Sequence, residues 1–429
     1  MVRHLMRHVS TSAFLRHNAI LFIGSLLVGA LNYAYYPILA RLLTVQAYGE
    51  VQTLMSSFVQ LLIFLTVLGQ VTVNVVANYQ DEDQKQKVVY ELEKLALLIS
   101  LILFVIVALC SWKLKSFFHF VSVWPFIILM LSIVMSVPLA FRSAFLRAHK
   151  KFLNVSLGNM LGASSDIIFS IVLVWIGWST VGAILGLVLA QLIAFLYIVR
   201  VARQTNFSRP SDVSLLTLPN VKLLAPELRY GGLVLCGSLI ITVLSGADIF
   251  VVKHFFNATI AGRYAGVSTV ARIVFFLTAS VSQVLLPSVR IHQTAQENRQ
   301  LFVKSLALVL ALGGTATLIF ALFPRLVITI LMGRHYLAYS HLLGRLSLVM
   351  LVLSVLNLII SYSIALRRYQ MAGIVIVGGL ITFVLLAVRH QTLEAVITSL
   401  LYGSATMLGM FAIWSLFLST NKMREGHEL

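Results

Sequence analysis

Charged residues are scarce in this sequence. Only 11% of its 429 residues are charged, whereas 59% are hydrophobic. Soluble globular proteins carry roughly 25% charged residues, so this chain lacks the polar surface that water requires. The mean hydropathy of +0.96 agrees with this. The composition therefore excludes a soluble globular domain as the bulk of the protein.

Cysteine and catalytic motifs are also nearly absent. The two cysteines, Cys110 and Cys236, lie in or beside apolar runs far apart in the sequence, and neither a disulfide framework nor a thiolate metal site follows from them. The sequence has no His-Glu-x-x-His pair, no nucleophile elbow and no phosphate-binding glycine loop with lysine. His4 and His8 have the spacing of metal ligands on a helix, but they lie among arginines, so we interpret their segment as a basic surface helix. We predict no metal, no cofactor and no enzymatic activity.

Apolar runs of about 20 residues recur from end to end instead, which is the length that crosses a membrane. Such segments must be helices, because lipid offers no partner for a free backbone amide. The first run, 19–40, is too long for a signal peptide and is followed by no small-residue cleavage site, so we interpret it as a span. We expect twelve spans, near 17–40, 49–76, 95–112, 122–146, 153–176, 180–199, 231–253, 263–287, 302–323, 341–366, 371–388 and 395–418.

Lysine and arginine predict the orientation. With the N-terminus inside, the cytoplasmic segments hold 22 of the 32 Lys and Arg residues, the outer loops hold 9, and Arg272 alone lies deep in a span. This bias places both termini in the cytoplasm. Together with anionic lipid at the inner surface it also explains the net charge of +18. Nucleic-acid binding is not expected, because the basic residues are spread over short loops.

A polar, proline-containing interval over 200–230 divides the spans into two sets of six. We expect an N-terminal six-helix lobe over 1–204, a cytoplasmic linker over 205–228 and a C-terminal six-helix lobe over 229–429. The halves are faintly similar: at an offset of 213 residues, Gly49 falls on Gly262 and Gln70 on Gln283. Transporters are commonly built from such repeats, with the binding site between them.

Polar side chains form stripes along three of the expected spans. They are Asn18, Ser25, Gly29 and Asn32 in the first span, Gln52, Ser56, Gln60, Gln70 and Asn74 in the second, and Ser268, Arg272 and Gln283 in the eighth. A helix surrounded by lipid has no reason to keep such a face, since each unpaired amide costs free energy there. Hydrogen bonding between packed spans is one explanation, and a shared water-filled cavity is the other. Several long stripes in one chain favour the cavity, for which the candidate residues are Arg272, Gln52, Gln60, Gln70, Gln283 and Asn32.

Three ionisable residues lie well inside spans: Asp166, Asp248 and Arg272. Each costs roughly 2.5–3.5 kcal/mol at the centre of a membrane helix, so each needs an explanation. Asp248 and Arg272 lie on neighbouring spans and are able to form a structural ion pair. Alternatively, Arg272 offers its guanidinium to a phosphate, while Asp248 or Asp166 takes a coupling proton or cation. Both explanations are able to hold at different stages of one transport cycle.

Three groups of short motifs carry a family resemblance. They are the run from Leu39 to Thr44 with Tyr48 and Gly49, the stretch from Pro138 to Phe152 with 177–186, and the set of 228–231, Asp248, 262–264 and Pro287. In order and spacing they resemble the polysaccharide flippases of the multidrug/oligosaccharidyl-lipid/polysaccharide exporter superfamily, over about two thirds of the chain. The last two spans match less well, because Arg389-His390-Gln391 stands where the family often has a glycine-rich turn.

The resemblance implies an all-α polytopic membrane protein, with two six-helix lobes in a V around a central cavity. It further implies that alternating access moves a lipid-linked glycan outward across the bacterial plasma membrane. Twelve spans suit O-antigen-type flippases better than lipid II flippases. We therefore expect a flippase for an undecaprenyl-diphosphate-linked oligosaccharide, with ion coupling. Membrane lipids, a polysaccharide polymerase and chain-length proteins are its expected partners.

Two alternatives remain open. The nearer one is an ion-coupled multidrug exporter of the same superfamily, which would more often carry acidic residues for cationic drugs. The other is a membrane glycan polymerase or ligase. Those enzymes generally need a sizeable outer loop, and every outer loop expected here has about 20 residues or fewer.

Overall fold

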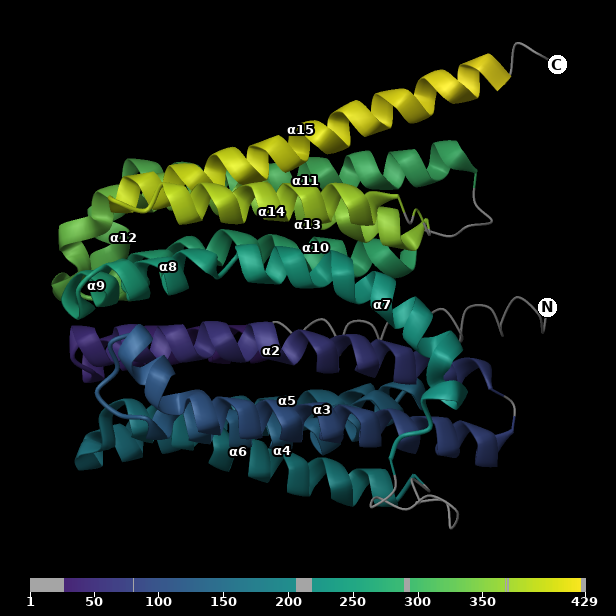
Figure 1. The fold of residues 1–429 in the computed structure, drawn as a ribbon, viewed down its shortest axis with the longest axis horizontal. Coiled ribbons are helices and arrows are strands. Elements are labelled where there is room, and N and C mark those ends of the chain that lie inside the picture. Colours follow the sequence, from purple (N-terminus) through teal and green to yellow (C-terminus); the bar gives the residue numbers. More distant parts are fainter. Residues whose placement is uncertain are drawn as a thin grey trace, which may run out of the picture. The chain divides into compact units, whose positions relative to one another are not determined.

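The fold is helical throughout the part of the chain that the computed structural model describes, namely residues 27–79, 81–205, 218–288, 294–366, 368 and 370–425. No strand occurs in these ranges (Figure 1). Nine helices within them are long and apolar enough to cross a membrane, or ten if one bent pair is counted as a single span. The all-α membrane fold expected from the sequence is confirmed, and the total of twelve spans stays a prediction.

The described chain falls into two compact units. The first takes the residues up to Ala47 and Phe64–Gly231, and the second takes Tyr48–Ile63 and the residues from Gly232 onward. Two helices, α2 (Val45–Asn78) and α7 (Val221–Leu244), therefore each contribute to both units. Residues 48–63 thus pack with helices from the second half of the sequence.

The first unit is a set of long, closely packed helices. Besides its parts of α2 and α7 it holds a helix over 27–42, α3 (Glu82–Phe117), α4 (Trp124–Ala148), α5 (Phe152–Leu173), the short π-helical turn η1 (Val174–Trp178) and α6 (Ser179–Arg203). Helix α6 packs on both α4 and α5. Thr44 caps α2 by accepting a hydrogen bond from the backbone N–H of Ala47 at 3.3 Å.

Helices α5 and α6 run antiparallel, although residues 152–203 are apolar and helical without a gap. The chain reverses at Gly177, whose φ of 104° is readily adopted only by glycine. Glycines then bring the two helices close: Gly158 lies against Ile198 and Gly186 against Ser170. The one apolar stretch therefore supplies the two spans expected at 153–176 and 180–199.

The second unit is built from shorter elements. Besides its parts of α2 and α7 these are α8 (Ala247–Phe255), α9 (Ala258–Ala271), α10 (Ile273–Ser288), α11 (Ala295–Leu322), α12 (Pro324–Leu331), the 3-10 helix η2 (Arg334–Leu342), α13 (Leu343–Ala365), α14 (Met371–Val388) and α15 (Leu393–Glu425). Asn257 caps α9, and Thr294 with Glu297 forms a capping box at the start of α11. These caps end the preceding loops sharply.

One helix break in the second unit was not expected from the sequence. Helices α7 and α8 meet at a 43° bend over Ser245 and Gly246, inside the span expected at 231–253. The Ser245 hydroxyl donates to the carbonyl of Thr242 at 2.8 Å, an interaction that competes with regular helical hydrogen bonding. Interrupted membrane helices are a common feature of transporter binding sites. Helices α9 and α10, by contrast, meet at Arg272 within one continuous apolar helix over 258–282.

The start of α2 crosses α9 closely within the second unit. A Cβ atom on Gly49 would lie 2.8 Å from the Cα atom of Gly262, so the two backbones touch. Small residues allow such close approach between membrane helices. These are the two glycines that the faint internal similarity relates to each other.

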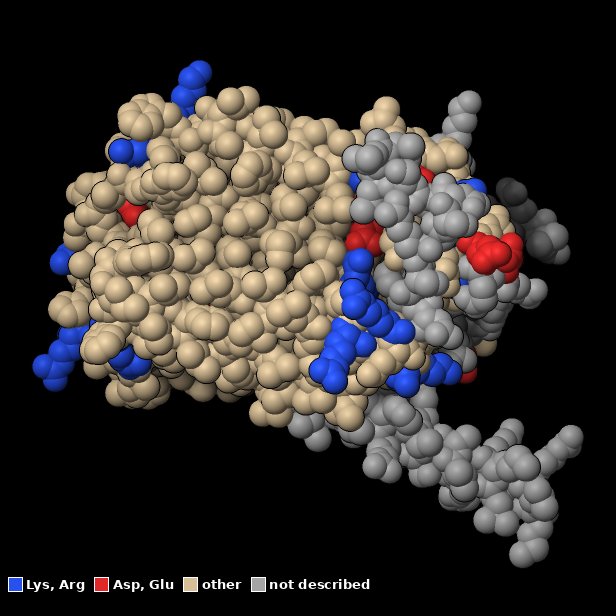
Figure 2. Space-filling model, turned by 90° about the horizontal axis from the view of Figure 1, so that it is seen from below, with Lys and Arg blue, Asp and Glu red and all other residues tan. Residues whose placement is uncertain are grey.

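The molecular surface has the character of a membrane protein. On the face drawn in Figure 2, Lys and Arg gather toward two ends, and the broad surface between them carries neither acids nor bases. Trp112, Trp124, Trp175 and Trp178 are exposed at helix ends of the first unit. Tryptophan is enriched where membrane meets water, so these side chains indicate the level of one interface.

Candidate functional site

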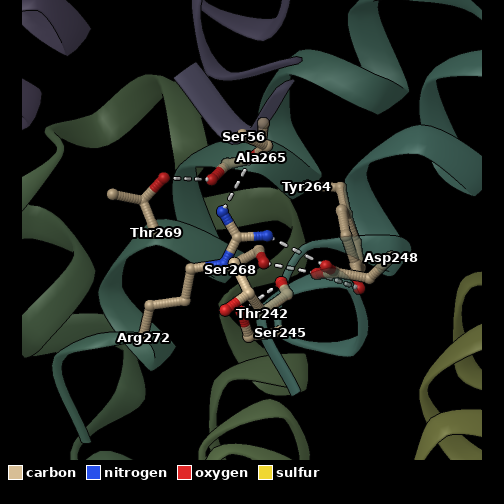
Figure 3. A network of polar contacts seen from close by, with 9 residues as sticks. All are labelled: Ser56, Thr242, Ser245, Asp248, Tyr264, Ala265, Ser268, Thr269 and Arg272. Carbon is tan, nitrogen blue, oxygen red and sulfur yellow. Dashed lines mark hydrogen bonds and ion pairs between the residues drawn. The ribbon is translucent and has the colours of Figure 1, made fainter. Parts of the chain in front are cut away.

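Asp248 and Arg272 form an ion pair within the second unit (Figure 3). Arg272 Nη2 lies 3.0 Å from Asp248 Oδ1. The Asp248 side chain is 0% exposed and that of Arg272 is 12% exposed, so only the cation reaches a surface. The ion pair that the sequence allowed is therefore present.

The bend between α7 and α8 precedes Asp248 directly. Asp248 lies in the first turn of α8, where the partial positive charge of the helix N-terminus favours a carboxylate. Arg272 lies where α9 meets α10, one turn after Ser268. The polar stripe of the eighth expected span therefore contacts Asp248 with two of its side chains.

The second carboxylate oxygen of Asp248 is also fully occupied. It accepts hydrogen bonds from the Tyr264 hydroxyl at 3.0 Å and from the Ser268 hydroxyl. A buried carboxylate is tolerated only when it is paired and hydrogen-bonded, and these two donors with Arg272 meet that need. Asp248 is held in place by three side chains from one neighbouring helix and its C-cap.

The far side of the Arg272 guanidinium faces α2. Its Nη1 donates to the Ser56 hydroxyl at 3.1 Å, while its buried Nε has no hydrogen-bond acceptor among the described residues. Gln60, one turn beyond Ser56, likewise has a buried Nε2 without an acceptor in this part of the chain. A Cβ atom on Gly246 would lie 2.7 Å from that Nε2, so the glycine leaves room beside it.

This arrangement places unused donors beside a cation. A buried N–H without an acceptor costs free energy, and an oxyanion is the ligand that satisfies several such donors together. A guanidinium suits phosphate in particular, because its planar fork matches two phosphate oxygens. Arg272, Gln60 and Ser56 therefore form a wall with the chemistry of an anion site.

Gln52 uses its amide inside the protein. Its Nε2 donates to the Tyr48 hydroxyl at 2.9 Å, and that hydroxyl lies 3.4 Å from Thr269 Oγ1. All three side chains are buried. This geometry matches the hydrogen bonding between packed helices that was one explanation of the stripe.

The other candidates lie apart from this wall. In the first unit, Asn32 and Gln70 are exposed, and Asp166 on α5 is half-buried and accepts a hydrogen bond from Ser170 at 3.1 Å. Gln283 belongs to α10, but its side chain lies outside the described residues. Asn18, Ser25, His4 and His8 lie outside them altogether.

Sequence reasoning missed a buried charged pair of the second unit. Glu50 and Lys253 are almost fully buried in the second unit and attract each other electrostatically. Lys253 lies at the end of an expected span and was therefore counted with the outer loops. A lysine followed by the polar start of the next helix does not by itself reveal a buried partner 203 positions earlier.

Comparison with known proteins agrees with the fold. A family model described as polysaccharide biosynthesis protein matches residues 38–341, a range that includes Ser56, Asp248 and Arg272. No curated protein matches the sequence. Among solved structures, the chain is similar to an inward-facing multidrug resistance MATE family transporter of the MOP superfamily, with a TM-score of 0.70 and 14% identity over 92% of this chain and 95% of that one.

Two further solved structures have a fold similar to that of this chain. The lipid II flippase MurJ in an inward closed conformation matches with a TM-score of 0.70 and 13% identity, over 92% of this chain and 87% of that one. A mutant of the MATE transporter VcmN from Vibrio cholerae matches with a TM-score of 0.64 and 13% identity, over 95% and 98%. At these identities the likeness concerns the fold. The family match confirms the resemblance to polysaccharide proteins found in the sequence, and the solved structures agree with its fold.

Proposed function

Because this chain belongs to the family of polysaccharide biosynthesis proteins, we propose that it is a flippase for a polyprenyl-diphosphate-linked oligosaccharide. The oligosaccharide is the repeat unit of an O-antigen or another surface polysaccharide. Alternating access carries it outward across the bacterial plasma membrane, with both termini of the protein in the cytoplasm. The transporter folds of the similar structures support a carrier rather than a polymerase or ligase.

The wall around Arg272 is the observation that carries the substrate class. The substrate's most strongly charged part is its diphosphate, and Arg272 offers a partly exposed guanidinium with Gln60 and Ser56 beside it. The planar fork binds phosphate oxygens in pairs. The polyprenyl tail needs no polar binding site, because it remains in lipid. Gln70, Gln283 and Asn32 stay candidates for contacts with the sugars, whereas Gln52 is buried and bonded to Tyr48.

Asp248 is the proposed ion-coupling residue, and Asp166 is the second candidate. Acidic residues inside membrane helices commonly mark the path of an ion, and both aspartates lie in such helices. We expect Asp248→Asn to impair gradient-driven transport more than folding. Full transport with an unchanged response to the proton gradient would exclude Asp248 from coupling.

Complementation tests the proposal as a whole. A bacterial strain that lacks its own flippase, and therefore its surface glycan, is given this gene or the Arg272→Ala variant, with membrane levels matched by blot. We expect the natural protein to restore surface glycan and the variant to restore almost none. Unrestored glycan in strains with several different repeat units would contradict the proposal.

A multidrug exporter is the second candidate, because two of the three similar structures above are MATE transporters. The same strains answer this question when their susceptibility to cationic drugs is measured. Raised drug resistance without restored glycan would favour the exporter.

A further inference from the structure

If the proposed function holds, Arg272 binds both the Asp248 carboxylate and the substrate's diphosphate. The structure shows the first of these anions already bound. Asp248 occupies Nη2 at 3.0 Å, and Ser56 takes Nη1 at 3.1 Å. Among the described residues, Nε of this guanidinium has no acceptor. Asp248 holds Nη2, the nitrogen that both two-pronged edges of the guanidinium share, so a diphosphate would have to share that nitrogen with the carboxylate.

Electrostatic repulsion also opposes the binding of both anions at once. A phosphate bound to Arg272 would lie within a few ångströms of the Asp248 carboxylate, and like charges at that distance repel strongly inside a protein. Asp248 is 0% exposed, so water does not screen the repulsion. Neutralising Asp248 removes this repulsion and also frees the Arg272 guanidinium from its ion pair.

We infer that Asp248 competes with the substrate's diphosphate for the Arg272 guanidinium, and that the strength of this competition sets the head-group affinity. Asp248 is thus a positioning residue that acts through Arg272. The inference rests on the proposed function and adds to it the part that Asp248 plays in setting head-group affinity.

Tyr264 and Ser268 influence how strongly Asp248 competes with the diphosphate for Arg272. Both donate to Asp248 Oδ2 and so satisfy part of its negative charge. When one of these donors is lost, the carboxylate depends more on Arg272 and holds it more firmly. Tyr264→Phe therefore weakens head-group binding, although the Tyr264 hydroxyl donates its hydrogen bond to Asp248 and not to the ligand.

Asp248→Asn has the opposite effect for a geometric reason. The asparagine oxygen is able to accept the hydrogen bonds of Tyr264 and Ser268, which leaves its NH2 group facing Arg272. Two donors then face each other, so the guanidinium is freed for the ligand. The local hydrogen bonds survive, whereas the attraction between the charges is lost.

The experiment measures binding of undecaprenyl diphosphate to the full-length protein purified in detergent. We expect Asp248→Asn to bind about tenfold or more tightly than the natural protein, since a charge-assisted competitor is removed. Tyr264→Phe is expected to bind several-fold more weakly. Asp83→Asn, the same loss of an acid at an exposed position of the first unit, is expected to leave the affinity unchanged. The gain in Asp248→Asn should disappear when Arg272→Ala is added.

The outcomes separate this inference from the proposed function. If neither the natural protein nor any variant binds the diphosphate, the proposed function fails. If the natural protein binds and Asp248→Asn binds equally or more weakly, the competition is refuted while the function stands. If Asp248→Asn does not fold, Tyr264→Phe decides, and an unchanged or raised affinity there overturns the inference. A gain that survives Arg272→Ala overturns it as well.

Discussion

Arg272 is the residue on which the charges of the site converge. Its guanidinium joins Asp248 on α8 to Ser56 on α2, and it is the partly exposed member of the pair. Sequence reasoning found both charges because ionisable residues are rare inside membrane spans. It did not find Gln60 and Gly246 as neighbours of the pair, because their closeness depends on a bend that the local sequence does not specify.

Substitutions of Arg272 separate its charge from its shape. We expect Arg272→Lys to lose a substantial part of transport, because lysine keeps the charge without the planar fork, and Arg272→Ala to lose nearly all of it. Transport is measured as surface glycan at matched membrane levels. In a double-mutant cycle, combining Arg272→Ala with Asp248→Ala should not restore transport. Restoration would mean that Arg272 only neutralises Asp248.

At the scale of helices, the sequence predicted well where the membrane-spanning helices lie. It did not predict where one of them bends. Spans followed from hydropathy because lipid demands long apolar runs. The reversal at Gly177 left a recognisable glycine between two apolar runs, whereas the bend at Gly246 lies inside one run. The placement of 48–63 in the second unit could not be predicted either, because α2 is one continuous helix and its local sequence marks no division at these residues.

The crossing of α2 and α9 predicts a specific sensitivity to volume. Alanine at Gly49 would place its Cβ 2.8 Å from the backbone of Gly262, which cannot rotate away as a side chain does. We expect Gly49→Ala to destabilise the protein by about 1–3 kcal/mol, seen as a lower melting temperature in detergent. Gly314→Ala on α11 is the control, since nothing lies within 4 Å of its Cβ position. Equal melting temperatures for the two variants would contradict the close crossing.

The start of α7 depends on one carboxylate of the first unit. Glu91 Oε2 accepts the backbone N–H of Asn220 at 2.8 Å, and its Oε1 lies 2.8 Å from Lys94 Nζ. Glu91→Ala should leave that N–H and Lys94 without this acceptor, at a cost of about 1–3 kcal/mol. We expect faster limited proteolysis near Asn220. Glu91→Gln keeps an acceptor and should behave nearly like the natural protein, and equal cleavage of all three would rule out this attachment.

For the whole molecule, the orientation is a prediction from the positive-inside bias. In a chain without Cys110 and Cys236, a cysteine is placed at Gln204, after α6, or at Gln391, after α14. Both glutamines are exposed and are expected on opposite sides of the membrane. We expect an impermeant thiol reagent to label Gln391→Cys in intact cells and to spare Gln204→Cys until the cells are opened. Ready labelling at Gln204 would reverse or refute the orientation.

Translocation in proteoliposomes tests the central claim most directly. The purified protein is reconstituted with a fluorescent undecaprenyl-diphosphate-linked oligosaccharide, and its arrival at the opposite leaflet is followed by quenching with an impermeant reagent. We predict that the natural protein moves this lipid much faster than protein-free vesicles do, and that Arg272→Ala does not. Translocation no faster than in protein-free vesicles, with uptake of a cationic dye by the same vesicles, would contradict the flippase and favour the multidrug exporter.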